Sequence, residues 1–199
     1  MTPRLILASG SVARAQLLRA AGVEFAVEPA DIDEAPIKKE YQAAGRDAAA
    51  CALALAELKA RAIGLRHPGA LIIGADQILV MGGAWFDKPD DLSQAAAQLR
   101  KLRGRAHHLV TAACVYRAGE RVWQAVSAPK LTMREFSEGF LASYIAAEGE
   151  VLLGSVGAYR LEGRGVQLFA RIEGDYFAIL GLPLLELLGF LRGHDALEK

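Results

Sequence analysis

The chain lacks the features that mark secreted and membrane-spanning proteins. Its 199 residues include only two cysteines, Cys51 and Cys114, which lie far apart in apolar segments with no cysteine or histidine at metal-ligand spacing. We therefore expect free, buried thiols in a reducing cytoplasm, and neither a disulfide nor a metal pair. No apolar run approaches the roughly 18 residues of a membrane span. The first predicted strand begins at Leu5, so we expect no signal peptide.

An excess of charge of one sign is also missing. Lys and Arg number 23, Asp and Glu number 23, and no block of like charge appears, so the net charge is zero. Any affinity for anions must therefore come from a local site, and nothing indicates a nucleic-acid-binding surface. Hydrophobic residues make up 53% of the chain, which is long enough for one large domain or two small lobes with a sizeable core.

The stretch 5–18, LILASGSVARAQLL, predicts a strand, a tight turn and a helix. Ser11 suits a helix N-cap, and Gly10 frees the turn from the constraints of a Cβ. Such a turn directs unpaired amides and the positive end of the helix dipole at one point, and Arg14 lies one helical turn further along. The natural ligand is a phosphate chain, and the alternative is an ordinary strand–helix junction with a surface arginine.

Two acidic positions are candidates for chemistry. The sequence Asp-Ile-Asp-Glu at 31–34 places three carboxylates in four residues, which either bind a hard cation or lie solvated in a loop. The predicted central strand 70–80 is apolar on both faces except where Asp76 and Gln77 interrupt it. A carboxylate there is costly unless it is paired, hydrogen-bonded or bound to a metal, so we expect Asp76 to be functional.

Two lysines and two histidines are candidates for either functional or structural roles. Lys59 falls in the last third of a predicted helix over 47–65, where a lysine is usually solvated or interacts with the helix dipole. Lys88 lies between a predicted strand and a proline, which restricts the backbone that carries it. His107 and His108 are adjacent in a predicted strand and point to opposite faces, which favours structural or surface roles over metal ligation.

The order of the predicted elements indicates the fold class. Strands alternate with helices in the first half and hairpins dominate the second, which favours an α/β chain with a mixed sheet and two lobes around a cleft. The phosphate-binding turn, the acidic loop and Asp76 would all open into that cleft. The second half is predicted to contain strands at 109–116, 122–126, 131–136, 166–172 and 177–182, helices at 137–148 and 184–191, and a loop-like stretch at 149–165.

Eight short motifs occur in order along the chain. They are LILASGSVAR at 5–14, DIDE at 31–34, ELKARA around Lys59, GADQ at 74–77, KP at 88–89, LRGRAHHLVT at 102–111, GAYRLEG at 157–163 and GLPL at 181–184. Together they resemble the Maf family of nucleoside triphosphate pyrophosphatases. The resemblance implies one Maf-like domain over residues 1–199, of the inosine-triphosphatase-like fold, with a mixed twisted sheet flanked by helices and two lobes around a central cleft.

The resemblance also implies an activity. The family hydrolyses the bond between the α and β phosphates of a nucleoside triphosphate, which yields a monophosphate and pyrophosphate and clears unwanted nucleotides from the pool. Asp76 matches the family's catalytic aspartate, and Glu34 matches its acidic-loop carboxylate. These two would hold a Mg²⁺ or Mn²⁺ cofactor, and Asp76 would also be the general base.

The remaining matched positions handle the triphosphate. Ser9, Ser11 and Arg14 correspond to the family's phosphate-binding turn. Lys59 and Lys88 correspond to lysines that neutralise charge, and they would stabilise the leaving pyrophosphate.

Three positions depart from the family members that act on thymidine and uridine triphosphates. Those members carry Pro-Arg-Arg, Thr and Gln where this chain has Val-Ala-Arg at 12–14, Gln77 and Glu162. Gln77 and Glu162 resemble the branch that acts on 7-methyl-GTP, and Glu162 is suited to accept hydrogen bonds from the N1–H and amine edge of a guanine. We therefore expect Ala13, Gln77 and Glu162 to be substrate-binding positions.

The resemblance finally implies a cytoplasmic homodimer whose partner is its nucleoside triphosphate substrate, with no nucleic-acid or membrane partner. The alternative is a nucleotide-binding regulator of septum formation and cell division with little catalysis. The complete set of carboxylates and lysines argues against lost catalysis. A Rossmann-type oxidoreductase is weakly supported, because the first turn lacks the GxGxxG pattern.

Overall fold

The computed structural model describes residues 3–198, which form two compact units. Unit 1 is built from the described residues up to Gln77, from Thr111–Ser127 and from the described residues after Gly174, and unit 2 from Ile78–Val110 and Ala128–Gly174. The strands β3 (Leu71–Met81) and β5 (Ala106–Arg117) belong partly to each unit. The cleft expected between two lobes stays a prediction.

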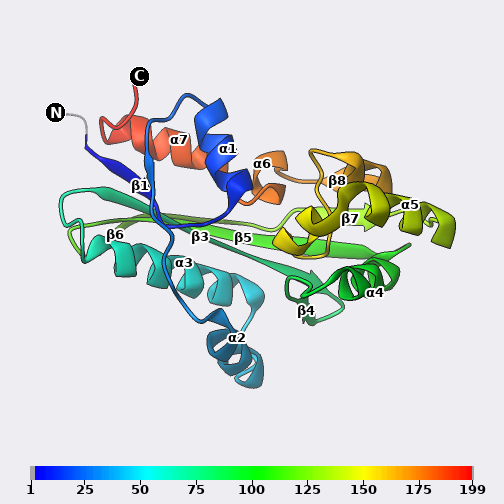
Figure 1. Ribbon diagram of the computed structural model, residues 1–199. Helices are drawn as coiled ribbons and strands as arrows, with labels where there is room; N and C mark the ends of the chain where they lie inside the picture. The colour runs from blue at the N-terminus through cyan, green and yellow to red at the C-terminus, as the bar shows by residue number, and fades with distance from the viewer. Residues whose placement is uncertain (1–2, 199) are drawn as a thin grey trace. The chain divides into compact units, whose positions relative to one another are not determined.

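Unit 1 is a mixed sheet with helices on both faces, which confirms the predicted α/β class (Figure 1). Across the sheet the order is β2 (Ala26–Val27), β1 (Leu5–Leu7), β3, β5 and β6 (Glu120–Ser127). Strand β1 runs parallel to both β2 and β3, whereas β5 and β6 form the predicted antiparallel hairpin. Helices α1 (Val12–Ala20) and α7 (Leu184–Gly193) cover one face, and α3 (Ala48–Gly64) covers the other.

Both faces of β1 and β3 are buried, which explains their continuous apolar sequences. Leu7 and Ile73 pack toward α1 and α7, whereas Ile6 and Ile72 pack toward α3. The two cysteines are free and buried in the described structure, as predicted. Among residues 3–198, no helix combines the length and apolar character that a membrane crossing requires.

Strand β3 and helix α3 come into close contact at Gly74. A Cβ at this position would collide with the carbonyl oxygen of Ala56 and would lie 2.9 Å from the Cβ of Ala60. Glycine is therefore required here by the approach of helix to strand. The contact lies two residues before Asp76 on β3 and next to Lys59 on α3.

Helix α3 confirms the prediction for 47–65, with Asp47 as its N-cap accepting from the Ala50 amide at 2.7 Å. The acidic stretch before it is not a loop throughout, because Glu34 begins a helix, α2 (Glu34–Ala43), that was not predicted. Asp33 caps α2 by accepting from the Ala35 amide at 3.2 Å. Pro36 lies in the first helical turn, where its missing N–H leaves no bond unmade.

The strand predicted at 177–182 is wrong. The segment forms a short helix, α6 (Tyr176–Ile179), because the Asp175 carboxylate accepts from the amides of Phe177 (2.9 Å) and Ala178 (3.2 Å). Gly181 follows with φ +105°, a conformation that residues with a Cβ rarely adopt. The helix α7 begins after Pro183, as predicted.

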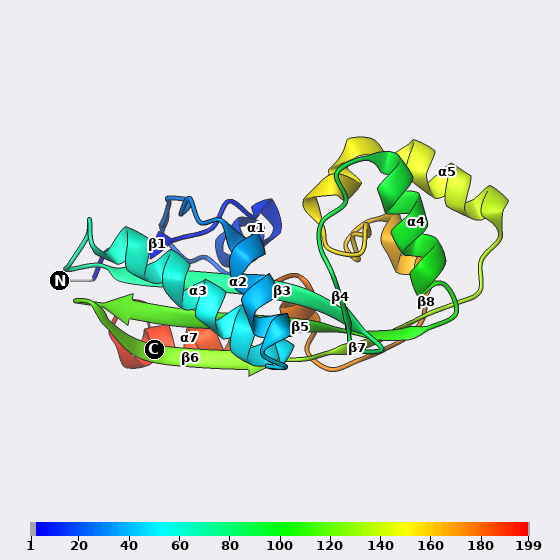
Figure 2. The ribbon, with the colours of Figure 1, turned by 90° about the horizontal axis from the view of Figure 1, so that it is seen from below.

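Unit 2 contains the last residues of β3 and the first residues of β5. Its other elements are β4 (Ala84–Phe86), α4 (Leu92–Leu102), β7 (Lys130–Met133), α5 (Glu138–Glu148) and β8 (Phe169–Glu173). Strand β4 pairs antiparallel with β3, and β7 pairs antiparallel with β5 and β8. Helices α4 and α5 lie side by side (Figure 2).

The glycine-rich stretch of unit 2 is more regular than predicted. It contains two short 3₁₀ helices, η1 (Gly149–Gly154) and η2 (Arg164–Leu168), so the strand predicted at 166–172 begins only at Phe169. The helix predicted at 137–148 is confirmed as α5, and Ser137 caps it by accepting from the Phe140 amide.

His107 and His108 point to opposite faces, as predicted. His107 is 1% exposed, and its Nε2 lies 2.8 Å from the Tyr159 hydroxyl. Its Nδ1 has no hydrogen-bond partner among the described residues. His108 is exposed and contacts the Ala128 carbonyl through Nδ1 at 3.3 Å. His107 is therefore a core residue of unit 2.

Burial lowers the pKa of His107 to about 4, with a smaller effect from His108. An unfolded histidine binds its proton near pH 6.5, so we expect this group to lower the free energy of unfolding by about 3 kcal/mol between that pH and pH 4. His107→Gln should remove this part of the pH dependence in urea unfolding measured from pH 7 to 4. His108→Gln is the matched control and should retain it, and equal slopes for all three proteins would contradict the prediction.

Candidate active site

The turn after β1 is built as the sequence predicts. Ser11 is the N-cap of α1, and its Oγ accepts from the Arg14 amide at 3.4 Å. The Oγ of the buried Ser9 accepts from the Ser11 amide at 3.2 Å. Helix α1 therefore presents its amino-terminal end at this turn, and phosphate binding there stays a prediction.

Arg14 is buried, so the alternative of a surface arginine is wrong. Its Nη1 donates to the Ser9 Oγ and to the Ala75 carbonyl oxygen, both at 3.0 Å, and its Nε donates to the Gly181 carbonyl oxygen at 2.9 Å. Burial lowers the pKa of the Arg14 guanidinium, while the carboxylates of Asp76 and Glu34 oppose that effect. Arginine stays protonated in proteins, so a positive charge is held at this point.

Three elements meet at the ammonium group of Lys59. Its Nζ lies 2.6 Å from Oδ1 of Asp76, on β3, and 2.6 Å from Oε1 of Glu34, on α2. Lys59 is 8% exposed, so it is not a solvated helix end. The structure thus brings two of the predicted acidic residues and one predicted lysine together in unit 1.

The two carboxylates differ in their proton affinity. Burial raises the pKa of Asp76, Lys59 opposes that effect, and the nearby Glu34 adds to it. Burial alone would also raise the pKa of Glu34, but the ammonium groups of Lys59 and Lys38 outweigh it and the pKa is lowered. Lys38 lies one turn along α2, 3.3 Å from Glu34, and was missed because α2 itself was not predicted.

The donor set of this site fits a hard divalent cation. Oδ2 of Asp76 is buried and has no hydrogen-bond partner among the described residues, which is costly for a carboxylate oxygen. No group of three or more His, Cys, Asp or Glu gathers within residues 3–198. Mg²⁺ is commonly held by one or two carboxylates together with substrate phosphates, so Glu34 and Asp76 fit this mode, and their binding of a cation stays a prediction.

Gln77, on β3, and Ala13, on α1, lie in unit 1 next in sequence to Asp76 and Arg14. The Nε2 of Gln77 is directed at the Thr111 hydroxyl, at 2.7 Å, and at two main-chain carbonyls of α6. Ala13 lies in the first turn of α1 and is partly exposed. Their contact with a substrate base stays a prediction.

Lys88 and Glu162 lie in unit 2. Lys88 is exposed just after β4 and precedes the buried Pro89. Glu162 is paired with Arg160, whose Nε donates to Oε1 at 3.2 Å. The predicted roles of Lys88 in leaving-group stabilisation and of Glu162 in base recognition stay predictions.

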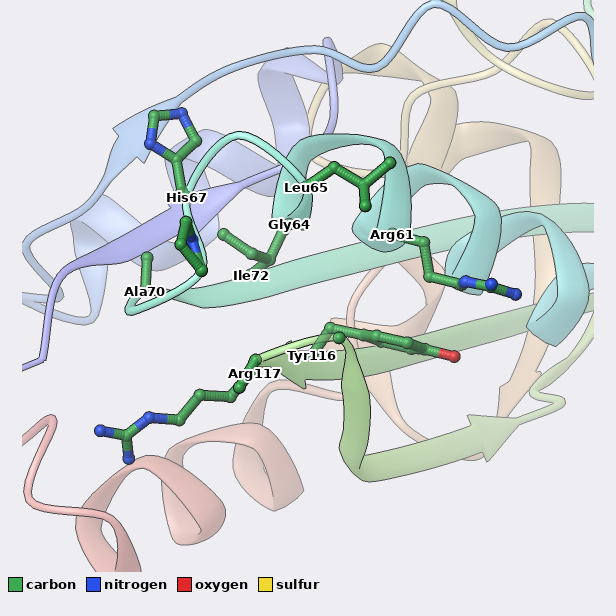
Figure 3. A pocket seen from close by; sticks show the side chains of 11 residues that line it. Arg61, Gly64, Leu65, His67, Ala70, Ile72, Tyr116 and Arg117 are labelled. Atoms are coloured by element: carbon green, nitrogen blue, oxygen red, sulfur yellow. The ribbon is translucent and has the colours of Figure 1, made fainter.

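A separate pocket of about 320 Å³ lies in unit 1 between the end of α3 and the turn joining β5 to β6 (Figure 3). Ile72 and the ring of Tyr116 line it, and Arg61 and Arg117 lie at its edges. None of the predicted site residues contributes to this pocket. The candidate site is therefore defined by the ion pairs of Lys59 with Asp76 and Glu34, and not by this pocket.

Comparison with known proteins identifies the family. Residues 4–194 match the family model described as Maf-like protein. A nucleoside triphosphate pyrophosphatase of Granulibacter bethesdensis is 57% identical over 194 residues, covering 98% of each chain. A 7-methyl-GTP pyrophosphatase of Rhizobium etli is 47% identical over 192 residues, covering 96% of each chain.

A solved structure of a nucleoside-triphosphatase (dITP/XTP pyrophosphatase) from Mycobacterium abscessus aligns with 96% of this chain and 94% of its own. Its TM-score of 0.43 and identity of 17% are too low to support an inference. The family assignment therefore depends on the sequence matches. The chain belongs to the family of Maf-like proteins.

Proposed function

We propose that this chain is a nucleoside triphosphate pyrophosphatase. It hydrolyses the bond between the α and β phosphates, with modified nucleotides such as 7-methyl-GTP among its substrates, and clears them from the nucleotide pool. The observation that carries the proposal is Asp76, a buried carboxylate with one oxygen on Lys59 and the other without a partner among the described residues, beside Glu34 and Arg14. The names of the relatives support it.

The chain's own residues account for the proton and charge movements. Hydrolysis adds water across a phosphoanhydride bond, so one water proton must be accepted and a charged pyrophosphate must leave. Oδ2 of Asp76, which has no partner among the described residues, would accept that proton. Burial raises the pKa of Asp76, and a bound cation would oppose that effect. The positive charges of Arg14, Lys59 and Lys88 would stabilise the phosphate oxygens.

Glu34 and Asp76 would hold Mg²⁺ or Mn²⁺, which supplies neutralisation of phosphate charge when bound. Two carboxylates this close repel one another unless a cation lies between them. Lys59 fulfils that requirement within the protein, because its ammonium group contacts both at 2.6 Å. We infer that Lys59 keeps the two oxygen donors close together and ready for the cation.

The activity is tested with a panel of triphosphates that includes 7-methyl-GTP, GTP, dTTP and UTP, with Mg²⁺, with Mn²⁺ and with a chelator. We expect pyrophosphate and a nucleoside monophosphate, and a loss of turnover with the chelator. Release of orthophosphate would contradict the bond assignment. Binding without turnover would favour the regulator of septum formation and cell division.

Base preference is tested at Glu162. We expect Glu162→Gln to lower the ratio of kcat/KM for 7-methyl-GTP to that for dTTP about tenfold, because an amide replaces one carboxylate oxygen that accepts from the guanine edge. Glu150→Gln changes an exposed glutamate of η1 and should leave the ratio unchanged. An unchanged ratio in Glu162→Gln would remove this residue from base recognition.

The cytoplasmic location and the homodimer stay predictions from the sequence, as does the absence of nucleic-acid and membrane partners. Light scattering of the purified protein at several concentrations tests the dimer directly. A monomer at all concentrations would contradict it.

A further inference from the structure

A side-chain network joins β3 and β5 to the short helix α6. The amide nitrogen of Gln77 lies 2.7 Å from the Thr111 Oγ1 and 3.0 Å and 3.1 Å from the carbonyl oxygens of Ala178 and Ile179. Thr111 is fully buried, and its hydroxyl donates to the Ala178 carbonyl at 2.8 Å. Both side chains therefore end on the last turn of α6.

Helix α6 needs such contacts to keep its position. It has four residues, and a helix of that length is unstable by itself in water. Asp175 caps its start, whereas Gln77 and Thr111 hold its end. The Gly181 amide donates to the same Ala178 carbonyl at 3.0 Å, so the contacts that hold Ala178 also place Gly181.

Gly181 connects this network to the candidate active site. Its carbonyl oxygen accepts from Nε of Arg14 at 2.9 Å, and a Cβ on Gly181 would lie 3.1 Å from that nitrogen. The other end of the Arg14 guanidinium donates to Ser9 and Ala75. A shift of α6 would therefore withdraw one of the acceptors that orient the guanidinium plane.

We propose that Thr111, together with Gln77, is a positioning residue for Arg14. The two side chains hold the last turn of α6, and the Gly181 carbonyl in turn holds the guanidinium at the Ser9 turn. This inference rests on the proposed function, in which Arg14 binds the triphosphate. In this proposal the amide nitrogen of Gln77 positions α6, a role separate from the contact with the substrate base that the sequence predicts.

The test compares Thr111→Val, which removes the hydroxyl at nearly constant shape, with Thr111→Ser, which keeps it. Thr132→Val, at a partly buried position of β7 in unit 2, is the control for the loss of a hydroxyl elsewhere. The first measurement is the hydrogen-exchange rate of the Arg14 Nε–H, observed by NMR without nucleotide and assigned with Arg14→Lys. We expect it to rise about tenfold in Thr111→Val and to stay close to the wild-type rate in Thr111→Ser and Thr132→Val.

The second measurement is steady-state release of pyrophosphate. We expect KM for the triphosphate to rise about tenfold in Thr111→Val with a smaller change in kcat, and Thr111→Ser to restore it. If Thr111→Val does not fold, Gln77→Met, which removes the amide donor, takes its place. An Arg14 exchange rate that stays unchanged, or that rises equally in Thr132→Val, would overturn the inference. If the wild-type protein releases no pyrophosphate, the proposed function fails, and the exchange rates still decide whether Thr111 positions Arg14.

Discussion

Asp76→Asn should lower kcat/KM for a nucleoside triphosphate by about three orders of magnitude, because it removes the general base and one of the two cation ligands together. Asn has nearly the same shape as Asp, but its amide cannot accept a proton at neutral pH. Pyrophosphate release at saturating Mn²⁺ is the measurement. Retained turnover would remove Asp76 from the proposed mechanism.

The same variant should stay folded. Burial raises the pKa of Asp76, so the surroundings disfavour its charged form, and a neutral amide of equal size costs little folding free energy. Asp47→Asn is a matched control, because Asp47 is an exposed N-cap of α3 and Asn caps helices as well as Asp does. Both variants should unfold near the wild-type temperature, while only Asp76→Asn loses activity.

Gly74→Ala should lower the free energy of unfolding by about 3 kcal/mol, near the upper end of the usual range for overpacking a core. The added methyl group would collide with the carbonyl oxygen of Ala56, which is backbone and cannot rotate away. Helix α3 would have to move from β3, and Lys59 would move from Asp76. We therefore expect activity to fall with stability, measured by urea unfolding and by pyrophosphate release.

Gly64→Ala is the control, because Gly64 lies on α3 and faces β3 at the same helix–strand interface. Its Cβ would lie 3.8 Å from Cγ1 of Ile72, an ordinary contact, and Ala is favoured over Gly in helices by about 0.5–1 kcal/mol. This variant should be as stable as the wild type or more stable, and fully active. If Gly74→Ala behaved like Gly64→Ala, the close approach of α3 to β3 would not be needed for the site.

Local chemistry made much of the fold predictable. Ser11 acts as the N-cap where the sequence predicts it, because a capping side chain binds amides only two or three residues away. The apolar run of β3 was equally clear. At 177–182 two local signals compete, and the predicted strand is wrong because the cap of Asp175 outweighs the apolar run that follows it.

The sequence by itself determined that Asp76 is an unusual residue, because a carboxylate within a buried strand is costly wherever that strand lies. It also determined the family, through motifs that keep their order along the chain. Only the tertiary structure decided that Lys59 forms ion pairs with both Asp76 and Glu34, and that Arg14 donates a hydrogen bond to Gly181. Those partners lie on separate elements, so their distances depend on how helix, strand and loop pack and not on any spacing in the sequence.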